Sequence, residues 1–193
     1  MYTKNEWRSV LLRRRRQVEA SVRSAYSSAI ARRLRDVPEF RLCGTLVSYR
    51  AMGAEVDPAS LIAEARGAGK RVCLVPSTGW RNPPGDSPSV ERASLGRNEG
   101  APRFVVVPGV GFDLSGVRLG RGGGYFDRVL EQLRRAGRVL VVGAAFEAQV
   151  VTALPWDPWD QSVDLIATER RLIVPRRADA GCDVVTTEKG DDR

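Results

Sequence analysis

Histidine is absent from this chain of 193 residues. Its absence excludes Ser-His-Asp and Cys-His nucleophilic catalysis, HExxH zinc sites and a histidine general base. Lysine is scarce too, because only Lys4, Lys70 and Lys189 are lysines among the 31 basic residues. Without histidine, any chemistry must use carboxylates, arginines, lysines, tyrosines, backbone amides, a bound metal or the reactivity of the substrate itself.

Cysteine and long apolar runs are also lacking. Cys43, Cys73 and Cys182 are too few and too far apart for a disulfide framework or a CxxC metal site, so we expect reduced thiols and a cytoplasmic location. No apolar run approaches the roughly 20 residues that span a bilayer. No apolar segment follows the first charged residues as it does in a secretory signal. We therefore expect no membrane partner.

The net charge of +8 is carried almost entirely by arginine. Arginine binds phosphate and carboxylate through a planar fork of donors, so the charge indicates a nucleotide, a nucleic acid or an acidic small molecule as partner. Solvated arginines without a partner explain the charge alone equally well. The run from Arg13 to Arg16 sweeps around a helix, which favours a solvated helix over an arm that binds nucleic acid.

The hydrophobic pattern predicts alternating strands and helices. Short apolar stretches typical of buried strands lie at 42–49, 72–75, 104–107, 139–145 and 162–167. Helical patterns lie at 4–35, from 57 to the glycines at 67–69, and at 122–133. Strands separated by helices are parallel, and the fully apolar strand at 139–145 is expected to be central.

We therefore predict an α/β fold: a single three-layer domain over residues 1–175, with a mainly parallel sheet flanked by helices. A polar tail is expected at 176–193. The long segment 76–102 is rich in Pro, Gly and Ser, and a loop of that length in a compact domain is typically functional or disordered.

The most informative stretch is the glycine-rich loop from Arg118 to Asp127, which follows the strand at 104–107. Ligands of such sheets bind beyond the carboxyl ends of strands. Glycines let backbone N–H groups approach phosphate oxygens, and the helix that begins next adds its positive N-terminal dipole. Arg118 and Arg121 can neutralise phosphate charge, and Asp127 can bind a divalent cation. A flexible surface turn is the alternative that composition leaves open.

The segment from Pro108 to Asp127 resembles the signature of the 5-formyltetrahydrofolate cyclo-ligase family, also called methenyltetrahydrofolate synthetases. That signature reads approximately PG-x-GFD-x-x-G-x-RLGRGxGYYD, and here Phe126 replaces its second tyrosine. The resemblance extends through most of the chain. It implies an enzyme that uses ATP and Mg²⁺ to cyclise 5-formyltetrahydrofolate to 5,10-methenyltetrahydrofolate. The formyl oxygen is phosphorylated, N10 attacks the activated carbon, and ADP and phosphate are released.

The resemblance also implies a role for individual residues. ATP binding falls to Lys4, Arg8, Arg118, Leu119, Gly120, Arg121, Gly122, Gly123, Gly124, Tyr125 and Phe126. Folate binding falls to Arg50, Glu55, Arg121 and Tyr125. Asp127 and Asp164 would pair at magnesium, and Arg121 and Tyr125 are the candidate catalytic residues. Apart from the resemblance, each residue also has a structural interpretation. Asp127 could interact favourably with the helix dipole, and Glu55 could pair with a nearby arginine. Tyr125 could be a packing aromatic, and Asp164 a solvent-facing residue of an edge strand.

Three segments depart from the family pattern. Leu95–Gly100 replaces an aromatic-Gly-Ile-Pro-Glu-Pro segment near the pterin, Trp159-Asp160 replaces a His-Asp pair, and Ser77–Ser94 has no clear counterpart. A paralogue with a changed substrate therefore remains an alternative, as does a basic nucleic-acid-binding protein. Trp156 and Trp159 fit surface packing and a ligand wall equally well. We expect a monomer whose partners are ATP and 5-formyltetrahydrofolate, without nucleic acid.

Overall fold

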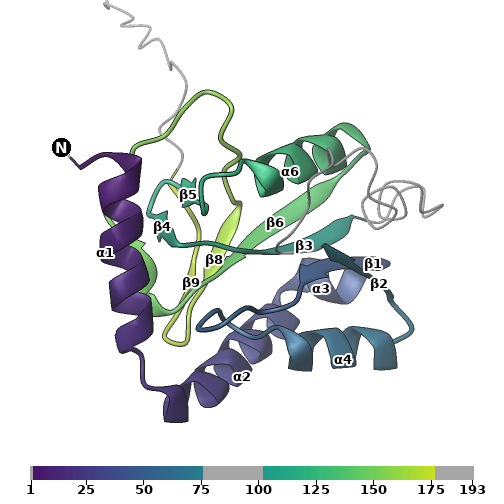
Figure 1. The fold of residues 1–193 in the computed structure, drawn as a ribbon. Helices are drawn as coiled ribbons and strands as arrows, with labels where there is room; N and C mark the ends of the chain where they lie inside the picture. Colours follow the sequence, from purple (N-terminus) through teal and green to yellow (C-terminus); the bar gives the residue numbers. More distant parts are fainter. Residues whose placement is uncertain (1, 76–101, 177–193) are drawn as a thin grey trace, which may run out of the picture.

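The computed structural model describes residues 2–75 and 102–176 (Figure 1). The predictions about the loops 77–94 and 95–100, and about nearly all of the tail, lie outside these residues. A six-stranded sheet in the order β2-β1-β3-β6-β8-β9 forms the centre. Its strands are β1 (Thr45–Tyr49), β2 (Arg71–Val75), β3 (Arg103–Pro108), β6 (Val139–Ala144), β8 (Leu165–Ala167) and β9 (Leu172–Ile173).

The sheet is mainly parallel, as predicted. Only β9 runs antiparallel to its neighbour, and β6 lies between β3 and β8, in the interior position expected for its apolar sequence. β1 and β2 are adjacent and parallel, which confirms the predicted strand–helix–strand unit. The parallel arrangement brings the carboxyl ends of β1 and β3 to the same edge.

Helices cover both faces of the sheet. The described helices are α1 (Lys4–Gln17), α2 (Ala20–Asp36), α3 (Pro38–Leu42), α4 (Ala59–Gly67), α6 (Tyr125–Arg135) and the short 3₁₀ helix η2 (Glu147–Gln149). Residues of α2, α3 and α4 pack with Phe104 and Val106 of β3, whereas α6 packs with Val105 and Val107. Alternate side chains of one strand therefore serve opposite cores. Figure 1 shows α6 on one side of the sheet and α2, α3 and α4 on the other, which confirms the three-layer prediction.

The single helix predicted over 4–35 is wrong, because two helices, α1 and α2, meet at Val18. Val18 has an extended backbone, with ψ 118°, and ends α1. The side chain of Arg23 donates hydrogen bonds to the carbonyls of Val18 and Arg16 at 2.9 and 3.1 Å. These bonds satisfy carbonyls that the break exposes. The sequence has neither proline nor glycine at the break, and the helical pattern of apolar residues continues through it. The break therefore could not be predicted from the pattern.

Other boundaries differ by a few residues. The strand predicted from 42 begins at Thr45, because Pro38–Leu42 forms the short helix α3. The last helix begins at Tyr125 rather than at 122, because Gly122 and Gly124 have φ values of 108° and 60°. Both values lie in the left-handed region, which interrupts a right-handed helix.

A second, small sheet was not predicted. It consists of β5 (Arg118–Leu119), β4 (Gly111–Asp113) and β7 (Val150–Val151). The Asp113 side chain, 2% exposed, stabilises the turn between β4 and β5. Its Oδ1 accepts hydrogen bonds from the amides of Ser115 and Val117, and its Oδ2 accepts one from the amide of Leu154 at 2.9 Å. One buried carboxylate thus fixes the start of the glycine-rich segment.

None of the described helices is both long and apolar enough to cross a membrane.

Replacing Asp113 with alanine should lower the free energy of unfolding by about 3 kcal/mol, because buried amide donors would lose a charged acceptor. Urea denaturation measures this. Asp36→Ala is the matched control, since its side chain is 61% exposed, and it should change stability by only about 0.5 kcal/mol. Equal effects of the two substitutions would contradict the role given to Asp113.

Candidate functional site

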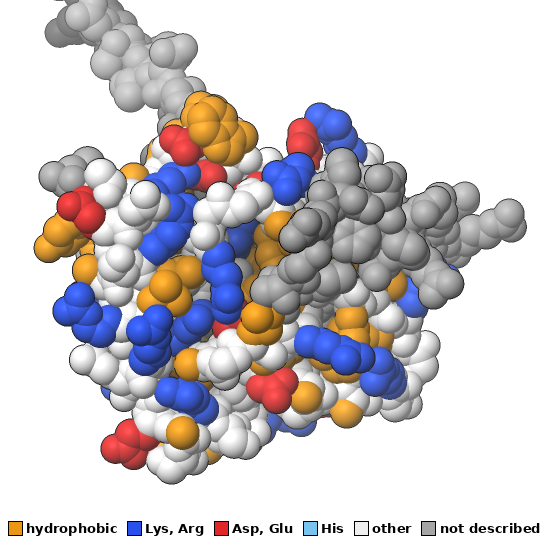
Figure 2. Space-filling model, viewed as in Figure 1, with side chains coloured by type: hydrophobic (Ala, Val, Ile, Leu, Met, Phe, Trp, Pro, Cys, Tyr) orange, Lys and Arg blue, Asp and Glu red, His pale blue; other side chains and the backbone are white. Residues whose placement is uncertain are grey.

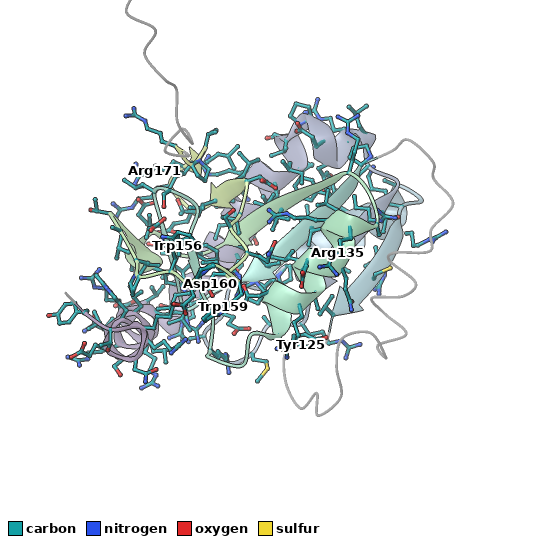
Figure 3. The ribbon with its side chains drawn as sticks, turned by 90° about the horizontal axis from the view of Figure 1, so that it is seen from above. Tyr125, Arg135, Trp156, Trp159, Asp160 and Arg171 are labelled. Carbon is teal, nitrogen blue, oxygen red and sulfur yellow. The ribbon has the colours of Figure 1, made fainter. Side chains whose placement is uncertain are left out.

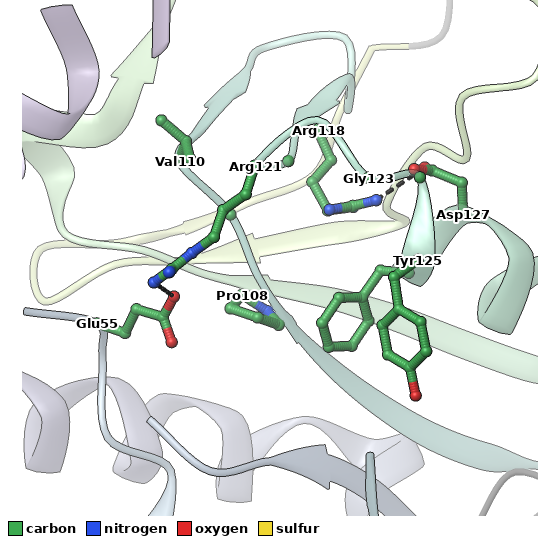
Figure 4. Close-up of a pocket in the computed structure, with 12 residues that line it drawn as sticks. Glu55, Pro108, Val110, Arg118, Arg121, Gly123, Tyr125 and Asp127 are labelled. Carbon is green, nitrogen blue, oxygen red and sulfur yellow. Dashed lines mark hydrogen bonds and ion pairs between the residues drawn. The ribbon is translucent and has the colours of Figure 1, made fainter. Parts of the chain in front are cut away.

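A cavity of about 260 Å³ opens at the carboxyl end of β3, beside the glycine-rich loop (Figure 4). It is lined by Glu55, Pro108, Gly109, Val110, Arg118, Gly120, Arg121, Gly123, Gly124, Tyr125, Phe126 and Asp127. Nine of these residues were predicted site residues. The structure therefore brings together most of the positions that the resemblance singled out, at the sheet edge where ligands of such folds bind.

Glu55 lies on the segment that follows β1 and faces the loop across this cavity (Figure 4). Its Oε1 accepts a hydrogen bond from Nη2 of Arg121 at 2.7 Å. The two side chains differ in exposure: that of Glu55 is 5% exposed and that of Arg121 is 47% exposed. Glu55 Oε2 also accepts a bond from the amide of Met52 at 3.0 Å. A buried carboxylate is thus joined to an arginine on an exposed loop.

Arg118 and Asp127 form a second ion pair, with Nη2 and Oδ1 2.7 Å apart. The Arg118 side chain is only 3% exposed and lies over the ring of Phe126, 5.7 Å from its centroid. The same oxygen of Asp127 accepts a hydrogen bond from the amide of Gln161 at 3.1 Å. Asp127 stands in the first turn of α6, where the helix dipole favours a negative charge.

Arg8 approaches the loop from α1. Its Nε donates to the carbonyl of Gly120 at 2.9 Å. A second hollow, of about 450 Å³, shares Val110 and Arg121 with the first. Its lining comprises Arg8, Leu12, Arg15, Arg16, Met52, Gly53, Ala54, Val110 and Arg121. Figure 2 shows basic side chains gathered on this side of the molecule. Several arginines around one hollow suit an anion.

Lys4 lies at the start of α1 and binds another segment of the chain. Its Nζ donates hydrogen bonds to Asp157, at 2.6 Å, and to Asp160. Burial alone would lower the pKa of Lys4, but these two carboxylates raise it above its ordinary value. Figure 3 shows Trp156, Trp159 and Asp160 on one loop between α1 and α6. The tryptophans are 62% and 70% exposed, so the structure places them at the surface.

Asp164 contacts β6 and the last turns of α6. Its Oδ2 accepts a hydrogen bond from the amide of Val141 in the first half of β6, and Arg134 lies 3.6 Å from its Oδ1. Arg134 follows Asp127 by two turns of α6, about 10 Å along the helix axis. Asp164 is fixed beside the end of α6, whereas Asp127 stands at its beginning. The pairing of Asp127 with Asp164 at magnesium therefore stays a prediction.

Three other predicted residues lie outside the described lining of the cavity. Leu119 is buried, and its carbonyl accepts a hydrogen bond from the amide of Val110 at 2.7 Å. Arg50 is exposed at the end of β1. Gly122 lies against Arg8, since an added Cβ would be 3.6 Å from the guanidinium carbon. Neither Leu119, Arg50 nor Gly122 belongs to the described lining of the cavity at Glu55.

Two contributors were missed in the sequence. Arg15 is buried and its Nη1 lies 3.8 Å from Oε1 of Glu55. Gln149, 1% exposed, donates from Nε2 to the carbonyls of Gly109 and Val110, both at 3.0 Å, and so fixes the turn after β3. Gln149 lies in a short 3₁₀ helix far from this turn in the sequence, so its contact with the turn has no local sequence signal. Arg15 is one of four consecutive arginines, and nothing in the sequence distinguishes it from the other three.

Fold and site define an α/β protein with an arginine- and glycine-lined pocket at the carboxyl edge of a parallel sheet. Residues 78–169 match the sequence model of the 5-formyltetrahydrofolate cyclo-ligase family. The 5-formyltetrahydrofolate cyclo-ligase of Mycolicibacterium smegmatis is 26% identical over 198 residues, which cover 91% of this chain and 98% of that protein. The Mus musculus protein of the same name is 33% identical over 103 residues, covering 52% of this chain and about half, 49%, of that relative.

Comparison with solved structures gives the same result as comparison of sequences. The 5,10-methenyltetrahydrofolate synthetase of Aquifex aeolicus superposes with a TM-score of 0.68 at 27% identity, over 96% of this chain and 99% of that one. That of Mycoplasma pneumoniae has the same fold, with a TM-score of 0.64 at 22% identity, over 87% of this chain and 99% of that one. These findings confirm the resemblance to the 5-formyltetrahydrofolate cyclo-ligase family that was recognised in the sequence.

The backbone of Gly122 offers a test of the loop. With φ at 108°, Gly122→Ala should lower the free energy of unfolding by about 2 kcal/mol through backbone strain. Gly123→Ala is the matched control: a Cβ there meets nothing within 4 Å, and the change should stay within about 0.5 kcal/mol. Thermal or urea denaturation reports both. If Gly122→Ala left the free energy of unfolding unchanged, the loop would not need this backbone conformation.

Proposed function

We propose that this chain catalyses the ATP-dependent cyclisation of 5-formyltetrahydrofolate to 5,10-methenyltetrahydrofolate, with release of ADP and phosphate. The observation that carries the proposal is the single cavity that joins Glu55 and Tyr125 to the arginines of the glycine-rich loop. It provides an acceptor for an amine or amide donor and cations for phosphate at the same place. The relatives carry the name of this activity, which supports the assignment.

The proposed chemistry needs no protein nucleophile. The formyl oxygen is a poor leaving group until it receives the γ-phosphoryl group of ATP. N10 of the folate then attacks the activated carbon, the bond between that carbon and the phosphorylated oxygen breaks, and phosphate leaves. The protein has to hold the reactants in line and to neutralise charge, which are the usual requirements of phosphoryl transfer. A chain without histidine can meet them.

The triphosphate is assigned to the loop and its neighbours on α1. Backbone amides from Gly120 to Gly124 supply donors, and the start of α6 supplies a positive dipole. Arg8, already bonded to the carbonyl of Gly120, would carry one phosphate contact. Lys4 enters this set only if it exchanges Asp157 and Asp160 for phosphate. Arg121 is the candidate for stabilising charge on the transferring phosphoryl group.

The folate is assigned to the opposite wall. Glu55 presents a carboxylate that can accept hydrogen bonds from the pterin or the N10 region, and Tyr125 and Phe126 form an edge-to-face aromatic pair with centroids 5.5 Å apart. Arg50 is exposed just after β1, and we assign it to bind the carboxylates of the glutamate tail of the folate. The assignments of Glu55 and Tyr125 rest on their placement around one cavity and on the resemblance, and that of Arg50 rests on the resemblance alone.

Of the two carboxylates predicted to bind magnesium, Asp127 is the one that we retain as a ligand. Mg²⁺ in such sites binds one or two carboxylates together with substrate phosphates, and Asp127 stands beside the loop where phosphates are expected. The described residues hold no cluster of three potential metal ligands. We therefore assign the metal to Asp127 with phosphate oxygens, where it would neutralise phosphate charge, and leave Asp164 as a structural residue.

The activity itself is testable with purified protein, Mg-ATP and 5-formyltetrahydrofolate. We expect methenyltetrahydrofolate to form, measured by its near-ultraviolet absorbance. Arg121→Ala should lower kcat by roughly 100-fold, the usual effect of removing one electrostatic stabiliser. Arg135→Ala is the control, because that side chain is 77% exposed at the other end of α6 (Figure 3). No product from a wild-type protein that still binds ATP would indicate a paralogue with another substrate.

The metal assignment makes a separate prediction. Asp127→Asn should raise the Mg²⁺ concentration needed for half-maximal rate by roughly tenfold or more, because a ligand is lost. Asp164→Asn should leave that concentration within about twofold, since its partners are Val141 and Arg134. Rate measurements over a magnesium titration compare the two variants. Equal shifts would restore Asp164 as a metal ligand.

A further inference from the structure

Arg15 differs from the other arginines of its run. Arg13, Arg14 and Arg16 are exposed, whereas the side chain of Arg15 is 7% exposed. Its Nε is buried and has no hydrogen-bond partner among the residues that the structure describes. Burying a guanidinium is unfavourable unless charge and hydrogen bonds compensate it. The placement of Arg15 therefore needs an explanation that helix packing alone does not give.

The compensating charge is Glu55. Nη1 of Arg15 lies 3.8 Å from Oε1 of Glu55 and donates a long hydrogen bond of 3.4 Å to the carbonyl of Gly109. Burial lowers the pKa of Arg15 and the carboxylate of Glu55 opposes this, while a guanidinium remains charged in any protein environment. Arg15 thus connects α1 to the floor of the cavity.

Glu55 consequently has two arginines of different kinds. Both approach the same oxygen: Arg121 at 2.7 Å from an exposed loop, and Arg15 at 3.8 Å from within a helix. Tyr49 adds no charge, because burial raises its pKa well above the ordinary value and its hydroxyl donates to the carbonyl of Val56. Arg121 can turn away from Glu55 into solvent because its side chain is on an exposed loop, whereas the Arg15 side chain is buried beneath α1.

We propose that Arg15 is the resident counter-charge of Glu55, and that it holds this carboxylate in place when Arg121 turns from Glu55 to a phosphate group. This rests on the proposed function, in which Arg121 serves the triphosphate. A buried carboxylate deprived of its cation would otherwise be strongly penalised. Arg15 touches no reacting atom, so it is a positioning residue that acts through Glu55.

The rival role is a strut that joins α1 to the turn after β3 through the carbonyl of Gly109. A strut would be needed whatever stands at position 55. A counter-charge would lose its effect once Glu55 is neutral. The double substitution Arg15→Met with Glu55→Gln separates the two roles, because residues in one ion pair give non-additive effects.

The experiment measures kcat and KM for both substrates. Arg15→Met should lower kcat/KM for 5-formyltetrahydrofolate by roughly 10- to 100-fold, mostly through KM, and leave the KM for ATP within about threefold. Arg15→Lys should recover part of the loss. Arg13→Met removes the same charge from an exposed position of the same helix and should stay within about twofold. In the Glu55→Gln background, Arg15→Met should have an effect of about threefold or less.

Two results would overturn the proposal. One is a kcat/KM of Arg15→Met that equals that of Arg13→Met. The other is an equal loss of kcat/KM from Arg15→Met in the wild-type and Glu55→Gln backgrounds. Urea unfolding of the same four proteins of the cycle gives a second readout that does not need turnover. The single variants should each lower the midpoint, and the double variant should lie above the additive value. If the wild-type protein makes no methenyltetrahydrofolate, the proposed function fails, and this cycle alone decides whether Arg15 and Glu55 are coupled.

Discussion

The site depends on one buried carboxylate and the cations that hold it. Glu55 is almost fully enclosed on the segment that follows β1, so its charge has to be balanced by partners from elsewhere in the chain. Arg121 brings the glycine-rich loop to it, and Arg15 brings α1. Segments that are far apart in sequence therefore converge on one cavity because a carboxylate is buried there. The proposed binding of a folate and a triphosphate at the same place follows from that convergence.

The fold makes this convergence geometrically simple. β1 and β3 are parallel neighbours, so the segment that carries Glu55 and the turn that begins at Pro108 leave the sheet at the same edge. Asp113 and Gln149 then fix the path of the chain between β3 and the loop through bonds to backbone groups. Left-handed glycines delay the start of α6 until Tyr125, which leaves the preceding amides free of the helix and close to the cavity.

Much of the fold was predictable, because the strands at 104–107 and 139–145 are short, apolar and separated by a helical pattern. The loop was predictable because its glycines and arginines are adjacent in sequence. The break at Val18, the small sheet and the burial of Arg15 were not, because each depends on contacts between distant residues such as Arg15 with Glu55. The pairing of Asp127 with Asp164 rests on the resemblance alone, because the contacts of Asp164 with Val141 and Arg134 depend on how distant segments pack.

The central claim is that the formyl oxygen of the substrate receives a phosphoryl group in this cavity. It is tested most directly by labelling that oxygen with ¹⁸O and recovering the released phosphate for mass spectrometry. The proposed reaction predicts that the label appears in the phosphate, because the bond between the formyl carbon and its oxygen is the one that breaks. Phosphate without the label, formed alongside methenyltetrahydrofolate, would contradict it.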